Sequence, residues 1–425
     1  MTRFNVLLAA WLIAPGALAT PLSFDTYLSA VESHSLELQS QQEGIVAAKA
    51  GVGIAGLRRD PEFTLGATRD TVRSVERRPV TWNPSISMAI ETGGKRAARI
   101  KAAHSNVALA EETVAGFKSE LYGTAAAAFT EACRTRDVAA RKEQTMAALS
   151  TVVEANTVRR KAGDVGGIEL LQSRVERDQF QAELAQARSE ADSAMLALSP
   201  PLGRQFDALF PDVQLACDFA AFADQDASVL LPQALGARSD VRIARATLDN
   251  MRDGAALVRA NRAVDPTVTV GLAAARGYHD GIDASGNPVE GAARSRALSI
   301  SLAIPIPLSR RDKGDIVQAE SSVTQAMLAL RQAELTAETQ VRTAQRQLRA
   351  AQDRLARYRD GVLVDAQKVV DGMRLSYVKG NASLLEWLAA QRSADEAYQG
   401  YVQARADAAI ASTQLQLAIG QRPSL

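Results

Sequence analysis

Apolar and small residues return every seven positions through the second half of the chain. One row comprises Leu330, Ala337, Ala344, Ala351 and Tyr358, and a second comprises Val341, Leu348, Leu355 and Val362. This spacing predicts helices that pack on their neighbours along a narrow seam. Because no proline occurs from Lys313 to Tyr377, we expect one helix there, about 100 Å long at 1.5 Å per residue. A compact domain needs no such helix, whereas a conduit across a wide compartment does.

Four other segments alternate between apolar and polar residues with a period of two. They contain Phe63, Leu65 and Ala67, then Val268, Val270 and Leu272, and the related stretches 85–90 and 299–304. This period predicts strands with one apolar face. Each segment has about ten residues, the length of a tilted strand that spans a membrane. We expect the first pair to turn through Asp70 to Pro79, and the second through a longer polar loop from Tyr278 to Arg294.

The two halves of the chain repeat each other in the same order. The stretch SISMAI at 85–90 returns as SISLAI at 299–304, and Gln186-Ala187-Arg188 returns as Gln403-Ala404-Arg405. Each half is expected to contain a helix, two strands, a very long helix, a tight turn and a returning helix. The predicted organisation is a first repeat at 20–200, a linker at 201–225 and a second repeat at 226–425.

Two glycines at equivalent positions, Gly163 and Gly380, are expected to end the long helices. Asp164 and Asn381 follow them, and glycine readily adopts the left-handed conformation that ends many helices. The returning helices begin near Ile168 and Leu384, and Ser383 is a suitable N-cap for the second. The sequence therefore predicts two helical hairpins.

The first nineteen residues have the pattern of a secretory signal peptide. Arg3 supplies positive charge, residues 6–13 are apolar, and Ala17-Leu18-Ala19 fits a cleavage site. No later run of about 18 apolar residues occurs, so any membrane crossing is expected to be made by strands.

Composition and motifs argue against catalysis and nucleic-acid binding. The net charge is +1, which gives no bulk attraction to nucleic acid. His34, His104 and His279 lie far apart in sequence, without a metal-ligand spacing. The segment Gly93-Gly94-Lys95 lacks the other residues of a phosphate loop. We predict no enzyme activity, no cofactor and no metal site.

Cys133 and Cys217 are the only cysteines. In an oxidising compartment they form one disulfide or remain two small buried hydrophobic residues, and the sequence leaves both open.

Four strands with an apolar face do not close a barrel, because single-chain barrels begin at eight strands. An open sheet edge is not tolerated in lipid. Two alternatives remain: several protomers combine their strands in one barrel, or the strands form a soluble sheet that the chain's own helices cover. The sequence favours the first. Three chains give twelve strands, although the strand count alone does not exclude a dimer.

The duplicated hairpins and two junction segments resemble the TolC-like outer-membrane factors of tripartite efflux systems. The segment 91–99, ETGGKRAAR, and the segments 304–308 and 311–316 resemble the heavy-metal, CzcC-like branch. The resemblance implies a mainly α fold with a small β part: long hairpins of an α-helical barrel and four strands of a trimeric, twelve-stranded transmembrane β-barrel. It also implies the outer membrane of a Gram-negative bacterium, with extension into the periplasm.

The partners and site residues follow from this resemblance. It implies a homotrimer in outer-membrane lipid that docks to a periplasmic adaptor and an inner-membrane RND-type transporter. Glu386 and its repeat partner Glu169 would line a periplasmic aperture, although both are also simple helix-start carboxylates. The adaptor-docking tips would be Lys161, Gly163, Asp164, Tyr377, Lys379, Gly380, Asn381 and Ser383.

The expected function is an exit duct for heavy-metal cations. Multidrug efflux and type I protein secretion remain alternatives within the same architecture. An alternative of another class is a periplasmic adaptor or a secreted coiled-coil protein, but an adaptor normally has one helical hairpin and a coiled coil needs no strands.

Overall fold

The computed structural model describes residues 21–69, 80–220, 222–223, 225–282, 284–308 and 313–425. The predicted signal peptide and the first strand connection, 70–79, lie outside these residues. Most of the chain is helical and four strands form one sheet, so the predicted mainly α fold with a small β part is confirmed. The chain divides into two compact units.

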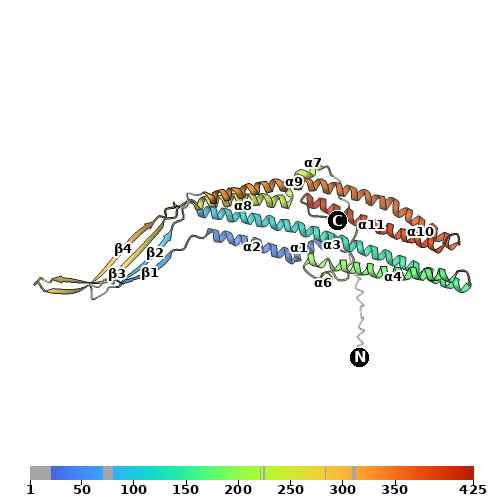
Figure 1. The fold of residues 1–425 in the computed structure, drawn as a ribbon, viewed down its shortest axis with the longest axis horizontal. Helices are drawn as coiled ribbons and strands as arrows, with labels where there is room; N and C mark the ends of the chain where they lie inside the picture. The colour runs from blue at the N-terminus through green and yellow to red at the C-terminus, as the bar shows by residue number, and fades with distance from the viewer. Residues whose placement is uncertain (1–20, 70–79, 221, 224, 283, 309–312) are drawn as a thin grey trace, which may run out of the picture. The chain divides into compact units, whose positions relative to one another are not determined.

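The sheet unit consists of Ser40–Gly116 and Ser239–Ala337. Its strands are β1 (Glu62–Arg69), β2 (Val80–Ala89), β3 (Thr267–Ile282) and β4 (Pro288–Ala303). They are antiparallel in the order β1-β2-β3-β4 (Figure 1). The register aligns Phe63, Ile86, Val270 and Ile300 in one row, so the predicted apolar face is continuous across both repeats.

The second strand pair is longer than expected. β3 and β4 contain 16 residues each, and their pairing continues from Arg276 opposite Arg294 to Ile282 opposite Pro288. The prediction of a long loop from Tyr278 to Arg294 was therefore wrong. Glycine and aspartate disfavour strands only weakly, and the pairing of a neighbouring strand overrides that preference.

The helices of the sheet unit are most of α2 (Leu36–Gly56), the first part of α3 (Lys95–Ala162), α8 (Ser239–Asn261) and the first part of α9 (Gly314–Arg357). Charged pairs join α3 to α8 and α8 to α9. Lys101 on α3 lies 2.8 Å from Asp253 on α8, and Arg259 on α8 lies 2.8 Å from Glu320 on α9.

The hairpin unit consists of Met1–Gln39, Phe117–Arg238 and Glu338–Leu425. Besides parts of α2, α3 and α9, it holds α1 (Phe24–His34), α4 (Gly167–Leu196), α5 (Ser199–Leu202), α6 (Phe206–Leu209), α7 (Ala227–Ala237), α10 (Leu363–Val378) and α11 (Leu384–Ala418). Figure 1 shows α10 beside α11 and the second part of α3 beside α4, each pair joined by a tight turn. The two predicted hairpins are therefore present.

The long helix of the second repeat is interrupted by one π-helical turn, Tyr358–Val362, between α9 and α10. Upstream, Val341 and Leu348 are buried against Leu415 of α11. The predicted next seam position, Val362, is 44% exposed, whereas Val370 is 7% exposed and packs on α11. Beyond the π-helical turn, the buried position is therefore one residue later in the sequence than the seven-residue spacing predicts, because a π-helical turn contains an extra residue. The expectation of an uninterrupted helix was wrong at this point.

Candidate functional site: the ends of the helical hairpins

Both hairpin turns begin with the same hydrogen-bonded helix end. Gly163 has φ of 86° and Gly380 has φ of 74°. The amide of Asp164 donates to the carbonyl of Arg159 at 2.9 Å, and that of Asn381 donates to the carbonyl of Ser376 at 2.9 Å. A hydrogen bond from the amide of residue i+5 to the carbonyl of residue i, with a glycine at positive φ just before the donor, is the Schellman motif. The two turns have the same backbone design, at positions that the repeat made equivalent.

The returning helices begin differently. On α11 the Ser383 amide donates to Glu386 Oε2 at 2.7 Å, and the Glu386 amide donates to Ser383 Oγ at 3.3 Å. This capping box lowers the pKa of the exposed Glu386 carboxyl, chiefly through the Ser383 backbone N–H. On α4 the N-cap is Gly166, which has no side chain to cap the helix.

Glu169, the repeat partner of Glu386, instead takes part in a contact between the hairpins. The Tyr377 hydroxyl on α10 lies 3.0 Å from Glu169 Oε1 on α4 and 2.9 Å from Asn156 Oδ1 on α3. Burial raises the pKa of Tyr377, and the hydrogen bond to Glu169 adds to this rise. The Tyr377 ring stacks on Trp387 with centroids 6.2 Å apart. One aromatic residue of the second hairpin therefore contacts both arms of the first.

A second contact between the hairpins is an ion pair with two hydrogen bonds. Arg392 on α11 donates through Nε and Nη2 to Glu176 on α4, at 2.6 and 2.7 Å. The hydrogen bond to Glu176 raises the pKa of Arg392. The bidentate geometry fixes the relative orientation of the two helices.

A third contact is buried. Asp395 on α11 is 5% exposed and accepts from Arg141 Nε and Thr145 Oγ1 on α3, both at 2.9 Å. Between it and the turns lies an apolar cluster from both hairpins, made of Leu149, Phe180, Leu384, Trp387 and Leu388. Polar contacts on each side of this cluster thus join the hairpins near their turns.

Sequence reasoning singled out Glu169, Tyr377 and Glu386 but missed Asn156, Arg392 and the Asp395 group. A signal for the last was present. Gln391 and Asp395 fall at seam positions of α11, in line with Leu384, Leu388 and Val402. Polar residues on such a seam indicate a specific contact.

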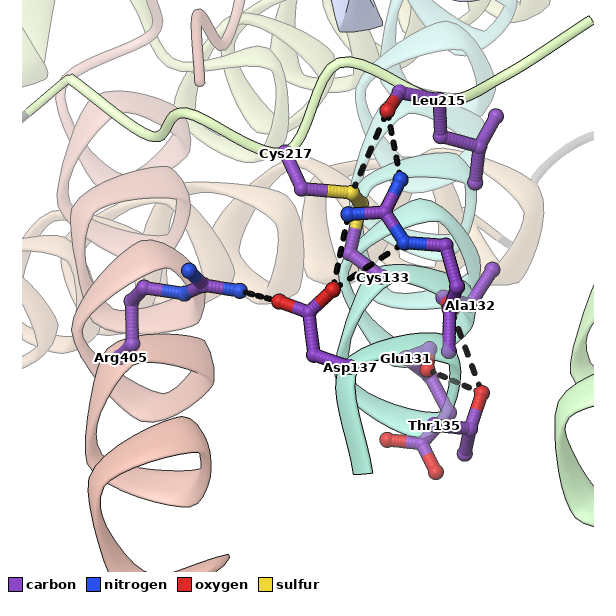
Figure 2. Close-up of a disulfide and its surroundings, with 9 residues drawn as sticks. Glu131, Ala132, Cys133, Thr135, Asp137, Leu215, Cys217 and Arg405 are labelled. Atoms are coloured by element: carbon purple, nitrogen blue, oxygen red, sulfur yellow. Dashed lines mark hydrogen bonds and ion pairs between the residues drawn. A yellow bond between two sulfur atoms is a disulfide. The ribbon is translucent and has the colours of Figure 1, made fainter. Parts of the chain in front are cut away.

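The structure bonds Cys133 of α3 to Cys217 of the segment between α6 and α7, with Cα atoms 5.7 Å apart. Figure 2 shows Asp137, one helical turn further along α3, in an ion pair with Arg405 of α11. Arg136 donates to the Leu215 carbonyl at 2.7 Å, and Leu215 also bridges to Leu22. This segment is therefore fastened to the hairpin unit at several points.

The glycine-rich segment after β2 forms a structural junction. Glu91 and Arg99 pair through both carboxylate oxygens, and Arg99 donates to the Leu57 carbonyl at 3.0 Å. Gly93 has φ of 65°, and a Cβ there would lie 2.2 Å from that of Ala263. The segment positions the start of α3 beside the preceding helix, as expected of a strand-to-helix turn.

Lys95 in the same segment is almost fully buried. Its Nζ lies 2.7 Å from Asp265 Oδ2, and the side chains are 8% and 10% exposed. The Thr92 amide also donates to Asp265, at 3.0 Å. Burial raises the pKa of Asp265, but the hydrogen bonds from Lys95 and Thr92 outweigh this, so the pKa lies below its usual value.

No helix among the described residues is both long enough and apolar enough to cross a membrane. No three His, Cys, Asp or Glu side chains in the described ranges gather closely enough to hold a metal ion.

The chain matches the family model of outer membrane efflux proteins over residues 27–204 and 230–421. The cobalt-zinc-cadmium resistance protein CzcC of Cupriavidus metallidurans is 28% identical over 318 residues, which cover 72% of this chain and 68% of that protein. The fold is similar to the CmeC outer membrane channel of Campylobacter jejuni, with a TM-score of 0.75, 14% identity, and coverage of 100% of this chain and 95% of that one. It is also similar to VceC of Vibrio cholerae, with a TM-score of 0.72, 18% identity, and coverage of 94% and 96%.

Proposed function

Because this chain belongs to the outer membrane efflux protein family, we propose that it forms the exit duct of a tripartite pump for heavy-metal cations. Family membership makes it an efflux channel of the outer membrane and not an enzyme, as the sequence predicted. The cation cargo is supported by the similarity to a cobalt-zinc-cadmium resistance protein. The proposed partners are a periplasmic adaptor and an inner-membrane RND-type transporter.

The observation that carries this proposal is the bare apolar face of the sheet. Phe63, Ile86, Val270 and Ile300 form one row across the strands and are 45% to 74% exposed. An apolar face of this extent needs a cover. Hydrocarbon supplies it, provided that β1 and β4 pair with strands of neighbouring copies so that no edge stays open. Three copies joined in this way form a twelve-stranded barrel.

The contacts between the hairpins support a duct that is shut at rest. Tyr377 and Arg392 hold the second hairpin against the first near the turns. Opening a passage at this end requires the hairpins to separate, and therefore requires these hydrogen bonds to break. Glu386 and Glu169 remain the proposed aperture acids. Glu169 also accepts the bond from Tyr377, so it would contribute to closure in two ways.

We expect Tyr377→Phe to raise the open fraction of single channels in planar bilayers by about tenfold. The change removes a hydrogen bond to a charged group, worth about 1.5 kcal/mol, only in the closed arrangement. Tyr398→Phe is the control, because no hydrogen bond of its hydroxyl is found among the described residues.

Glu386→Ala should raise conductance as well if that carboxylate narrows the aperture. Traces identical to wild type for both variants would remove this closing role.

We expect Gly380→Val to weaken co-purification with the adaptor. A β-branched residue does not tolerate φ of 74°, so the turn that presents Lys379 and Asn381 would distort. Gly372→Val is the matched control, since this helical glycine has no positive φ and open space around it. Equal recovery of the adaptor with both variants would show that the turn is not its docking site.

The cargo is tested by growth of a deletion strain. We expect greater sensitivity to zinc, cobalt, cadmium or copper salts and unchanged sensitivity to dyes and detergents, with growth restored by the intact gene. Sensitivity to dyes and detergents alone would favour the multidrug alternative. Loss of a secreted protein without either sensitivity would favour type I secretion.

A further inference from the structure

Arginines border the apolar face of the sheet near the end where β1 connects to β2 and β3 connects to β4. Arg69 pairs with Val80, and Arg276 pairs with Arg294. Trp82 pairs with Ala274, so the same register places Val80 level with Arg276. Arg69, Val80, Arg276 and Arg294 thus form one row across all four strands.

A fourth arginine occupies the adjacent row. Arg296 pairs with Ala274 and is level with Trp82, which is 52% exposed. Side chains alternate between the two faces of a strand. The four arginines therefore lie on the same face as Leu272, Leu298 and Ile300, and they follow directly on that apolar band.

This arrangement concentrates charge that the described residues do not neutralise. Arg276 stands directly opposite Arg294, and like charges in that position destabilise a strand pair. No ion pair or hydrogen bond of the four arginine side chains is found among the described residues, and all four are exposed. An external anion would relieve the repulsion.

We propose that Arg69, Arg276, Arg294 and Arg296 bind the phosphate groups of lipid headgroups in the outer leaflet. The proposal rests on the proposed function, which puts this face in hydrocarbon and the helices in the periplasm. The helices adjoin the opposite ends of the strands, so the arginines face the outer surface. The band beside them takes the acyl chains, and the planar guanidinium groups match phosphate oxygens. The exposed Trp82 occupies the depth at which tryptophan is common in membrane proteins.

The test uses the purified full-length protein in neutral detergent with diphosphorylated lipid A as the probe. We compare wild type with the triple variant R276Q/R294Q/R296Q and measure bound lipid A by native mass spectrometry. An arginine near an anionic membrane surface contributes about a fivefold gain in affinity. We therefore expect the triple variant to bind lipid A at least about tenfold more weakly, and added salt to reduce that difference.

Two controls make the result specific. The variant R174Q/R331Q/R346Q removes three exposed arginines of the helices and should bind lipid A like wild type. Phosphatidylcholine, whose headgroup has no net charge, should bind equally to all three proteins. Equal binding of lipid A by the two triple variants would overturn the proposal, whether both resemble wild type or both are weakened.

The outcome is separate from that of the proposed function. Extraction from outer membranes by detergent and migration as an oligomer test the channel itself. Suppose that the wild-type protein is an oligomeric membrane protein but binds lipid A no better than R276Q/R294Q/R296Q. That result would refute only the lipid site. A wild-type protein that is recovered as a water-soluble monomer refutes both.

Discussion

Replacing Lys95 by methionine is expected to lower the free energy of unfolding by about 3 kcal/mol. The substitution keeps most of the volume of the side chain but removes the close cation of the buried Asp265, which is left with only the more distant guanidinium of Arg59 at 4.0 Å. Removing one partner of a buried ion pair is strongly destabilising. The Thr92 amide, which donates to Asp265 at 3.0 Å, is too little to compensate. The measurement is thermal unfolding of the detergent-purified protein, followed by circular dichroism.

The control for this prediction is Lys49→Met. Lys49 lies 3.5 Å from Glu111, but the two side chains are 61% and 52% exposed, and an exposed pair contributes at most about 1 kcal/mol. The pH dependence gives a further check. The lowered pKa of Asp265 stabilises the folded protein above the usual carboxyl pKa, and this contribution is lost as the pH falls through the lowered value. The gap between wild type and Lys95→Met should therefore narrow in acid, and equal losses in the two lysine variants would contradict the prediction.

The second large effect is expected from removing the disulfide. The double variant C133A/C217A should lose about 2–4 kcal/mol, since the bond closes a loop with a sequence separation of 84 residues and restricts the unfolded chain. The measurement is thermal unfolding with and without reductant. Reductant should lower the midpoint of wild type towards that of the variant and leave the variant unchanged. A wild-type midpoint that does not respond to full reduction would mean that other contacts, such as Arg136 to the Leu215 carbonyl, fix the segment alone.

The features that were predictable from sequence depend on local or periodic patterns. The seven-residue rows placed Val341 and Leu348 in the core, and both are fully or almost fully buried. Alternation located all four strands and their apolar face. Gly163 and Gly380 were recognisable because few other residues tolerate their φ values. Ser383 was recognisable as an N-cap because its oxygen accepts from the first turn of α11.

The features that were not predictable depend on contacts between distant segments. Tyr377 meets Asn156 and Glu169 only after two hairpins pack together. The repeat suggested equal roles for Glu169 and Glu386, yet only Glu386 has a serine three residues before it to form a capping box. The π-helical turn was also hidden. Tyr358 reads as a seam residue, but its ring lies where a Cβ on Gly400 would come within 2.6 Å, so that glycine makes room for it.

The π-helical turn also determines where this gene tolerates the loss of a codon. Each residue rotates an α-helix by about 100°, so a deletion within α10 would turn the rest of that helix away from α11. Deletion of Gly361 instead removes the surplus residue of Tyr358–Val362. Val370 would then follow Val341 by a whole number of seven-residue steps and would stay on the face that packs on α11. Single-codon deletions compatible with folding should therefore concentrate at this one turn of the helix.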